Sequence, residues 1–221
     1  MTTSTTKLPV WDGFIRGYHW LQALSVLGLW YTGTEGLMDW HFSIAYFLMA
    51  LLLTRLIWGV FGSDTAQFEQ FVRSPRTVFA YFRHPNATTQ HGHNPAGAYM
   101  VLFFMLLLLS QLVTGLFAND DIISEGPLAY LVSSATSSEM TQLHALNFDV
   151  LLGAIGLHVA AVFIYLLKKD NLITPMIHGK KPSQGLPAPQ LRNGIIGWVI
   201  FLVIGSVIYS YWAKDVVMYL F

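Results

Sequence analysis

The sequence predicts an all-α integral membrane protein built as a bundle of transmembrane helices. Three observations support this fold class. The 221 residues are 54% hydrophobic and only 11% charged, whereas a soluble domain carries about a quarter charged residues. The hydrophobic residues gather in five runs of the length that spans a bilayer. Most tryptophans lie near the ends of these runs, where amphipathic rings are favoured.

The five runs predict transmembrane helices, because a backbone in lipid must satisfy its own hydrogen bonds. We expect one domain, residues 1–221, with the first run retained rather than cleaved as a signal peptide. The expected spans are 14–32, 41–60, 98–118, 143–167 and 194–212. Between them we expect a short amphipathic surface helix in the inner loop 62–97, and an extended tether at "GKKPSQGLPAPQ" in the inner linker 168–193.

The basic residues predict the orientation. With the N-terminus in the cytoplasm, only Lys214 falls on the outer side, and the other Lys and Arg residues lie at or near the inner side, which is the positive-inside pattern. The C-terminus is then periplasmic. The inner residues are Lys7, Arg16, Arg55, Arg73, Arg76, Arg83, Lys168, Lys169, Lys180, Lys181 and Arg192.

Composition also excludes several classes of function. The formal net charge is zero, so no basic excess indicates a nucleic-acid partner. The chain has no cysteine, which excludes disulfides, thiolate-bound iron–sulfur clusters and covalently attached c-type haem on this chain.

Four histidines lie in the predicted spans. His144 and His158 are 14 residues apart, close to four helical turns, so they share one face and lie about 21 Å apart along the helix. His19 matches the depth of His158, and His41 matches that of His144. Ionisable residues inside a membrane are costly and usually functional. The pattern predicts two facing histidine pairs, one in each leaflet.

Two imidazoles without thiolates suit few cofactors. Zinc normally takes four ligands, and two histidines alone are incomplete for copper or iron. The haem porphyrin supplies four nitrogens, so two axial histidines complete a six-coordinate iron suited to electron transfer. We therefore expect two haems b, the inner one held by His19 and His158 and the outer one by His41 and His144.

Two arginines are candidate partners for the propionates of the inner haem. Arg55 lies 14 residues after His41 and shares its face of the second span. Arg16 lies one turn before His19. The alternative is that both side chains reach out to the inner headgroups.

The stretch "GHNPAG" begins the third span. Asn94 is placed to cap that helix. A functional interpretation puts His93 and Asn94 beside the inner haem, in contact with a propionate or a quinone.

These residues stand in longer motifs: "VWDGFIRGYHW", "HFSIAY", "RLIWGVFGS", "GHNPAGAYM" and "LLKKDNLITPMIHGKK". With the four spaced histidines, the motifs resemble the bacterial cytochrome b561 family, which includes the b-type cytochrome subunits of nickel–iron hydrogenases. The resemblance covers about residues 9–182. It implies a four-helix core with two haems in the inner membrane, with His19, His41, His144 and His158 as ligands. The fifth helix, about 194–213, lies outside that core.

The function we expect is electron transfer across or within the membrane, between a quinone pool and a redox partner. The partner would be a cytochrome c or a dehydrogenase or hydrogenase subunit, and the quinone would be a substrate. One alternative is a stand-alone quinone oxidoreductase with a small diffusible donor or acceptor. Another is a proton or metal transporter using the same histidines, although the repeats and interrupted helices common in transporters are not evident.

The two sides of the membrane differ in charge. Donors gather on the inner side, where they would stabilise negative charge on a quinone during reduction. An acidic outer side would suit a basic redox protein, although both features also follow from membrane orientation alone. The outer acids are Glu35, Asp39, Asp120, Asp121, Glu125 and Glu139.

Overall fold

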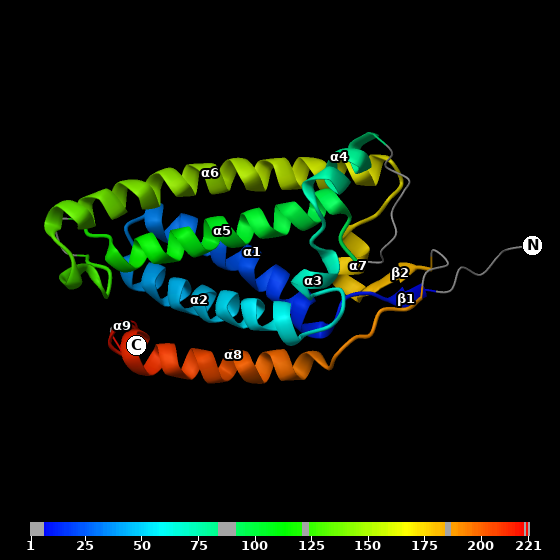
Figure 1. The fold of residues 1–221 in the computed structure, drawn as a ribbon. Coiled ribbons are helices and arrows are strands. Elements are labelled where there is room, and N and C mark those ends of the chain that lie inside the picture. The colour runs from blue at the N-terminus through cyan, green and yellow to red at the C-terminus, as the bar shows by residue number, and fades with distance from the viewer. Residues whose placement is uncertain (1–6, 84–91, 121–123, 184–186, 219, 221) are drawn as a thin grey trace, which may run out of the picture. The chain divides into compact units, whose positions relative to one another are not determined.

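The computed structural model describes residues 7–83, 92–120, 124–183, 187–218 and 220. These residues are mostly helical (Figure 1). The helices are α1 (Gly13–Thr34), α2 (Met38–Phe61), α3 (Phe68–Phe71), α4 (Pro75–Arg83), α5 (Pro95–Phe117), α6 (Ser134–Leu167), α7 (Ile173–His178), α8 (Gly194–Ile208) and α9 (Lys214–Met218). A 3-10 turn, η1 (Ala129–Leu131), precedes α6, and a π-helical turn, η2 (Tyr209–Ala213), joins α8 to α9.

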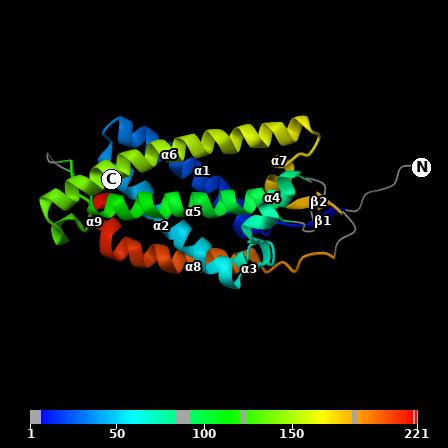
Figure 2. The ribbon, with the colours of Figure 1, turned by 45° about the horizontal axis from the view of Figure 1, so that its top comes forward.

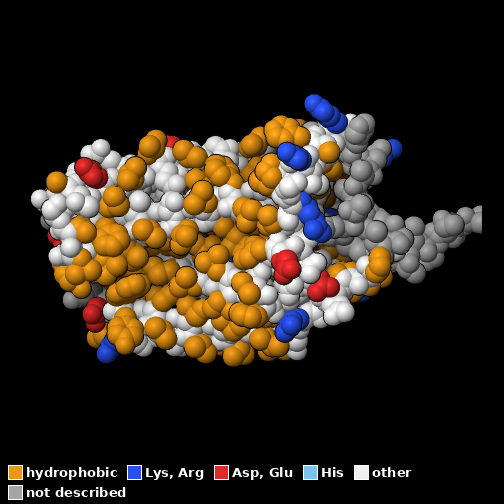
Figure 3. Space-filling view, viewed as in Figure 1, with side chains coloured by type: hydrophobic (Ala, Val, Ile, Leu, Met, Phe, Trp, Pro, Cys, Tyr) orange, Lys and Arg blue, Asp and Glu red, His pale blue; other side chains and the backbone are white. Residues whose placement is uncertain are grey.

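Four helical stretches in the described part of the chain are long and apolar enough to cross a membrane: Met38–Phe61, Pro95–Phe117, Ser134–Leu167 and Gly194–Met218. They confirm the membrane bundle, and hydrophobic side chains cover much of the visible surface of the long helices in Figure 3. The first predicted span is also a helix, the 22-residue α1. Arg16, His19 and Gln22 lower its hydropathy, so α1 is not among the four, and its crossing stays a prediction.

Helix α6 begins nine residues before the predicted start of its span, at Ser134 rather than at 143. Ser133 caps this end, because its Oγ accepts a hydrogen bond from the amide of Thr136 at 3.2 Å. The early turns are also tied to the end of α5, where Ser137 Oγ donates to the Phe117 carbonyl at 2.7 Å. Hydropathy marks only the lipid-facing part of such a helix, so it missed this extension.

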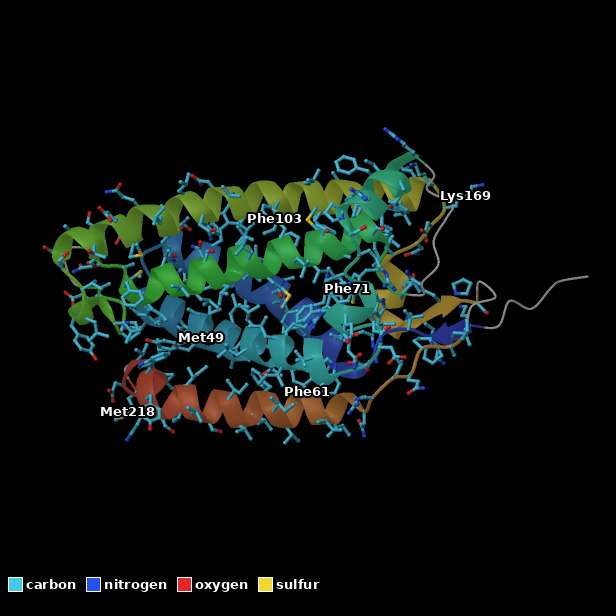
Figure 4. All side chains as sticks on the ribbon, in the orientation of Figure 1. Met49, Phe61, Phe71, Phe103, Lys169 and Met218 are labelled. Carbon is cyan, nitrogen blue, oxygen red and sulfur yellow. The ribbon has the colours of Figure 1, made fainter. Side chains whose placement is uncertain are left out.

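The inner loop forms two short helices where one was expected. α3 ends at Phe71, and α4 starts at Pro75. The break precedes a proline, which disfavours helical geometry in the residue before it. Phe71 is buried (labelled in Figure 4), whereas Phe79 on α4 is 73% exposed. Arg76 and Arg83 of α4 are also exposed, whereas Tyr81 of the same helix is buried, so α4 has the two-faced character expected of a surface helix.

The inner linker 168–193 contains two regular elements that the prediction of an extended tether at "GKKPSQGLPAPQ" did not include. α7 forms there, and β2 (Lys180–Pro182) pairs antiparallel with β1 (Lys7–Pro9) (Figure 2). Gly179, with φ of 78°, ends α7 in the left-handed conformation that favours glycine. Its carbonyl accepts a hydrogen bond from the Val10 amide at 2.7 Å. The linker therefore anchors the start of the chain.

The chain divides into two compact units. The first consists of Met1–Leu21, Leu53–Leu102 and Ala160–Leu202, and the second of Gln22–Leu52, Phe103–Val159 and Val203–Phe221.

The fifth long helix packs against helices of the family-like core within each unit. In the first unit the Phe14 ring contacts the rings of Trp58 and Trp198, with centroids 5.5 Å and 5.2 Å away. In the second unit Tyr46 of α2 lies against Trp212, with ring centroids 6.2 Å apart. These contacts make α8 and η2 part of the packed bundle.

Candidate cofactor sites

The second unit brings the predicted outer histidine pair together. His41 lies in the first turn of α2, and His144 lies on α6. Their ring centroids are 6.3 Å apart, and the ring planes are inclined by 66°. The two imidazoles therefore lie close together on different helices, and their ligation of a metal stays a prediction.

Both outer histidines are held through Nδ1. His41 Nδ1 lies 3.1 Å from the carbonyl oxygen of Leu29, and His144 Nδ1 lies 3.0 Å from that of Gln111. A carbonyl oxygen can only accept, so each Nδ1 must carry the hydrogen. Each Nε2 then keeps its lone pair, which is the tautomer that a metal-binding histidine needs.

Each of these imidazoles also lies beside a threonine hydroxyl and a glycine. Thr32 Oγ1 lies 3.3 Å from His41 Nδ1, and Thr114 Oγ1 lies 3.2 Å from His144 Nδ1. The next residue along each helix, Gly33 or Gly115, packs directly against the imidazole. Sequence reasoning missed these residues. The available signal was the dipeptide Thr-Gly near the same end of two spans.

The distance between the two outer histidine rings is compatible with a metal held between them. Two metal–nitrogen bonds of about 2 Å in line, plus the distance from each ring nitrogen to its ring centre, would separate the ring centres by about 6 Å. The observed separation is 6.3 Å. Within the described residues, no group of three or more His, Cys, Asp or Glu is placed to hold a metal ion. A cofactor that supplies its own equatorial nitrogens therefore suits the donors better than a bare ion.

Replacing Gly115 with alanine is expected to weaken the outer site. The new Cβ would lie 3.0 Å from His144 Cε1, so the imidazole must move by a few tenths of an ångström. Haem retention should fall by about tenfold or more, as for other changes behind a metal ligand. Haem content after a detergent wash measures this. Gly153→Ala is the control, because its Cβ would meet nothing within 4 Å; equal losses in both variants would refute the steric argument.

The two predicted inner histidines lie in different compact units. His19 belongs to the first unit and His158 to the second, so their pairing remains a prediction from helical spacing. His158 packs edge-on against Phe104, with ring centroids 5.7 Å apart. His19 makes a similar contact with Trp20 at 5.0 Å.

The two arginines differ in how they are engaged. Arg55 is only 3% exposed and lies 5.1 Å from the centre of the Phe68 ring. Its buried Nη1 has no hydrogen-bond partner among the described residues, so this donor is available to an anionic ligand. Arg16 is instead bound to backbone, with Nη1 donating to the Ile177 carbonyl at 2.6 Å and Nε to that of Asp12 at 3.3 Å. Arg55 is therefore the better candidate of the two arginines for pairing with an anionic group.

His93 is enclosed by aromatic rings. The ring centroids of Trp11 and Phe71 lie 4.7 Å and 4.9 Å from that of His93. Burial, together with the nearby positive charges of Arg55 and Lys181, lowers the pKa of His93 to about 3. The imidazole is therefore neutral at neutral pH. Its buried Nδ1 has no hydrogen-bond partner within the described part of the protein.

Asn94 caps α5, as predicted. Its Oδ1 accepts a hydrogen bond from the Gly97 amide at 2.7 Å. Its Nδ2 donates to the Tyr165 hydroxyl at 3.0 Å, and that hydroxyl lies 2.7 Å from the hydroxyl of Tyr81. Since both ends of the amide are engaged, His93 is the stronger of the two candidates for contact with a ligand.

Asp12 organises the N-terminal end of α1, and sequence reasoning did not single it out. Its Oδ1 caps the helix by accepting from the Ile15 amide at 2.8 Å. Its Oδ2 accepts from Trp58 Nε1 at 3.0 Å and from Ser63 Oγ at 2.6 Å. The motifs "VWDG" and "WGVFGS" thus meet at one buried carboxylate, which supports the helix that carries His19.

The bundle of apolar helices and the outer histidine pair together define a membrane-bound b-type cytochrome. The chain matches the family described as prokaryotic cytochrome b561 over residues 10–179, and it belongs to that family. Membership implies a multi-pass membrane protein that binds haem b and takes part in electron transfer. The comparisons with curated proteins and with solved structures found no match.

Proposed function

We propose that this protein is a diheme b-type cytochrome that moves electrons across the membrane between a quinone and a redox protein. The observation that carries the proposal is the outer pair, with ring centroids 6.3 Å apart and both Nδ1 atoms directed at carbonyl oxygens. A bound haem b would supply reversible one-electron chemistry. His41 and His144 would hold the outer haem, and His19 and His158 the inner one.

The inner cluster supports binding of anionic and reducible groups. Arg55 would pair with a propionate of the inner haem, because its buried Nη1 lacks a partner among the described residues. Arg16 would support the same region less directly, since it is bound to the carbonyls of Ile177 and Asp12. His93 would contact the quinone, which takes up two electrons and two protons when it is reduced to the quinol.

The charge distribution supports an orientation with the N-terminus inside. Several Lys and Arg side chains gather near α3 and α4 in Figure 3. The described outer acids, Glu35, Asp39, Asp120, Glu125 and Glu139, are all exposed, and Asp121 lies outside the described residues. An exposed acidic side would attract a basic redox protein such as a cytochrome c. Family membership favours a hydrogenase-type redox subunit as partner.

Substitution of His93 tests the side of the quinone site. We expect His93→Ala to slow quinone-linked turnover by about tenfold or more, because a group beside the reacting ring is lost. Both haems should remain bound. Asn94→Asp should have a smaller effect, since it keeps the capping oxygen and replaces the Nδ2 donor with a second carboxyl oxygen. The control is His178→Ala at an exposed position. Normal turnover in His93→Ala, with substitutions in the outer loop blocking the quinone reaction, would reverse the assignment of sides.

A vesicle assay tests the function as a whole. Purified protein is reconstituted into lipid vesicles that enclose ferricyanide, and a quinol is added outside. We expect reduction of the enclosed ferricyanide, and none in vesicles with His41→Ala. A protein that reacts with quinol and acceptor only on the same side would be the stand-alone oxidoreductase. A colourless protein would favour the transporter.

A further inference from the structure

Two separate helices hold the outer histidines with the same local arrangement. In α1 the residues are Leu29, Thr32 and Gly33, which surround His41. In α5 they are Gln111, Thr114 and Gly115, which surround His144. We call each set a Thr-Gly clasp. The spacing is identical in the two helices, although the rest of their sequences differ.

The threonine hydroxyls are oriented as acceptors. Thr32 Oγ1 donates its hydrogen to the Gly28 carbonyl at 2.8 Å, and Thr114 Oγ1 donates to the Ser110 carbonyl at 2.7 Å. A hydroxyl has one hydrogen and two lone pairs. With the hydrogen used one turn back in its own helix, the lone pairs remain for the histidine Nδ1–H, which therefore lies beside two acceptors.

The glycines set the distance of approach. A Cβ at Gly33 would lie 3.2 Å from His41 Cε1, and one at Gly115 would lie 3.0 Å from His144 Cε1. A residue with a side chain at either position would push the imidazole away by a few tenths of an ångström. The clasp therefore fixes both the tautomer and the rotation of each ring.

We propose that Thr32 and Thr114 are positioning residues that lower the midpoint potential of the outer haem. The inference rests on the proposed ligation by His41 and His144. An acceptor on Nδ1–H increases the basicity of the imidazole. A more basic ligand stabilises ferric over ferrous iron, and hydrogen bonding behind the ligand is one of the ways a protein sets a haem potential. Because the clasp acts on both axial ligands, its two effects have the same sign.

The test compares Thr32→Val, Thr114→Val and the double variant with the native protein. Redox titration and electron paramagnetic resonance follow the two haems separately. We expect each valine to raise the potential of the outer haem only, and the double variant to raise it most. The g-values of that haem should shift, and its retention should fall by about tenfold. Thr32→Ser and Thr114→Ser keep the hydroxyl and should restore native values.

Thr34→Val is the matched control. Thr34 Oγ1 also donates to carbonyls in its own helix, those of Trp30 at 3.0 Å and Tyr31 at 2.9 Å, but it is exposed. Unchanged potential and g-values in the double valine variant would overturn the proposal. If a valine variant loses the haem outright, the serine variant decides: retention with native potential supports the clasp, and loss overturns it. If His144→Ala leaves both haems in place, the ligation itself is wrong.

Discussion

Replacing His144 with alanine is expected to remove one haem and leave the other in place. His144 and His158 lie about 21 Å apart along α6, so the loss of one ligand leaves the other haem undisturbed. The haem content should fall from two per chain to one, and transfer across a vesicle membrane should fall to background. His158→Ala should remove the other haem. Difference spectra of the reduced proteins would show distinct b-type bands missing in the two variants.

A matched control shows whether haem loss follows from removing a ligand or from removing any histidine. His178 is exposed in the last turn of α7, and its replacement by alanine should leave both haems bound. Should His144→Ala keep both haems with native spectra, His144 is not a ligand and the outer pair has another role.

Replacing Asp12 with alanine is expected to destabilise the inner end of the bundle strongly. The change removes the cap of α1 and leaves Trp58 Nε1 and Ser63 Oγ without their acceptor. Loss of a cap costs about 1 kcal/mol, and each buried donor left unpaired costs about 1–3 kcal/mol. The free energy of unfolding should fall by at least about 3 kcal/mol. Thermal denaturation in detergent would show a lowered midpoint.

Two further substitutions test whether the lost hydrogen bonds of Asp12 cause the destabilisation. Asp12→Asn keeps a capping oxygen but presents an amide NH₂ in place of the second acceptor, so it should lie between the native protein and Asp12→Ala. Asp64 also accepts a backbone hydrogen bond, from the Gln190 amide at 2.8 Å, but this hydrogen bond is exposed to solvent. Asp64→Ala should cost far less. Equal destabilisation by both alanine substitutions would contradict a special role for Asp12.

Most of the fold was predictable because lipid imposes simple rules. Long apolar runs must be helices, and the ends of α2, α5 and α8 fall close to the predicted ones. The exceptions depend on contacts that hydropathy does not record. α6 extends to Ser134 because Ser133 caps it and Ser137 bonds the end of α5. The sheet of β1 and β2 has only three residues in each strand, too few for a periodic signal.

In the candidate site too, some residues could be predicted from the sequence and others could not. The candidate ligands could be singled out because an ionisable residue in lipid is unusual, and because helical periodicity relates His144 to His158. Their ligation of haem stays a prediction. Thr32 and Thr114 carry no such signal, since threonine is common in membrane helices and its partner here lies on another helix. Asp12 precedes the first span and looks like an ordinary helix cap. Only the fold brings it to Trp58 and Ser63.

The number of haems per chain tests the central claim most directly. The purified protein is extracted with acid acetone, and the extract is assayed as the pyridine haemochrome against protein concentration. Two pairs of histidines and no cysteine predict two haems b per chain, all of them extractable. One haem per chain, or a colourless protein, would contradict the pairing of His19 with His158 and of His41 with His144.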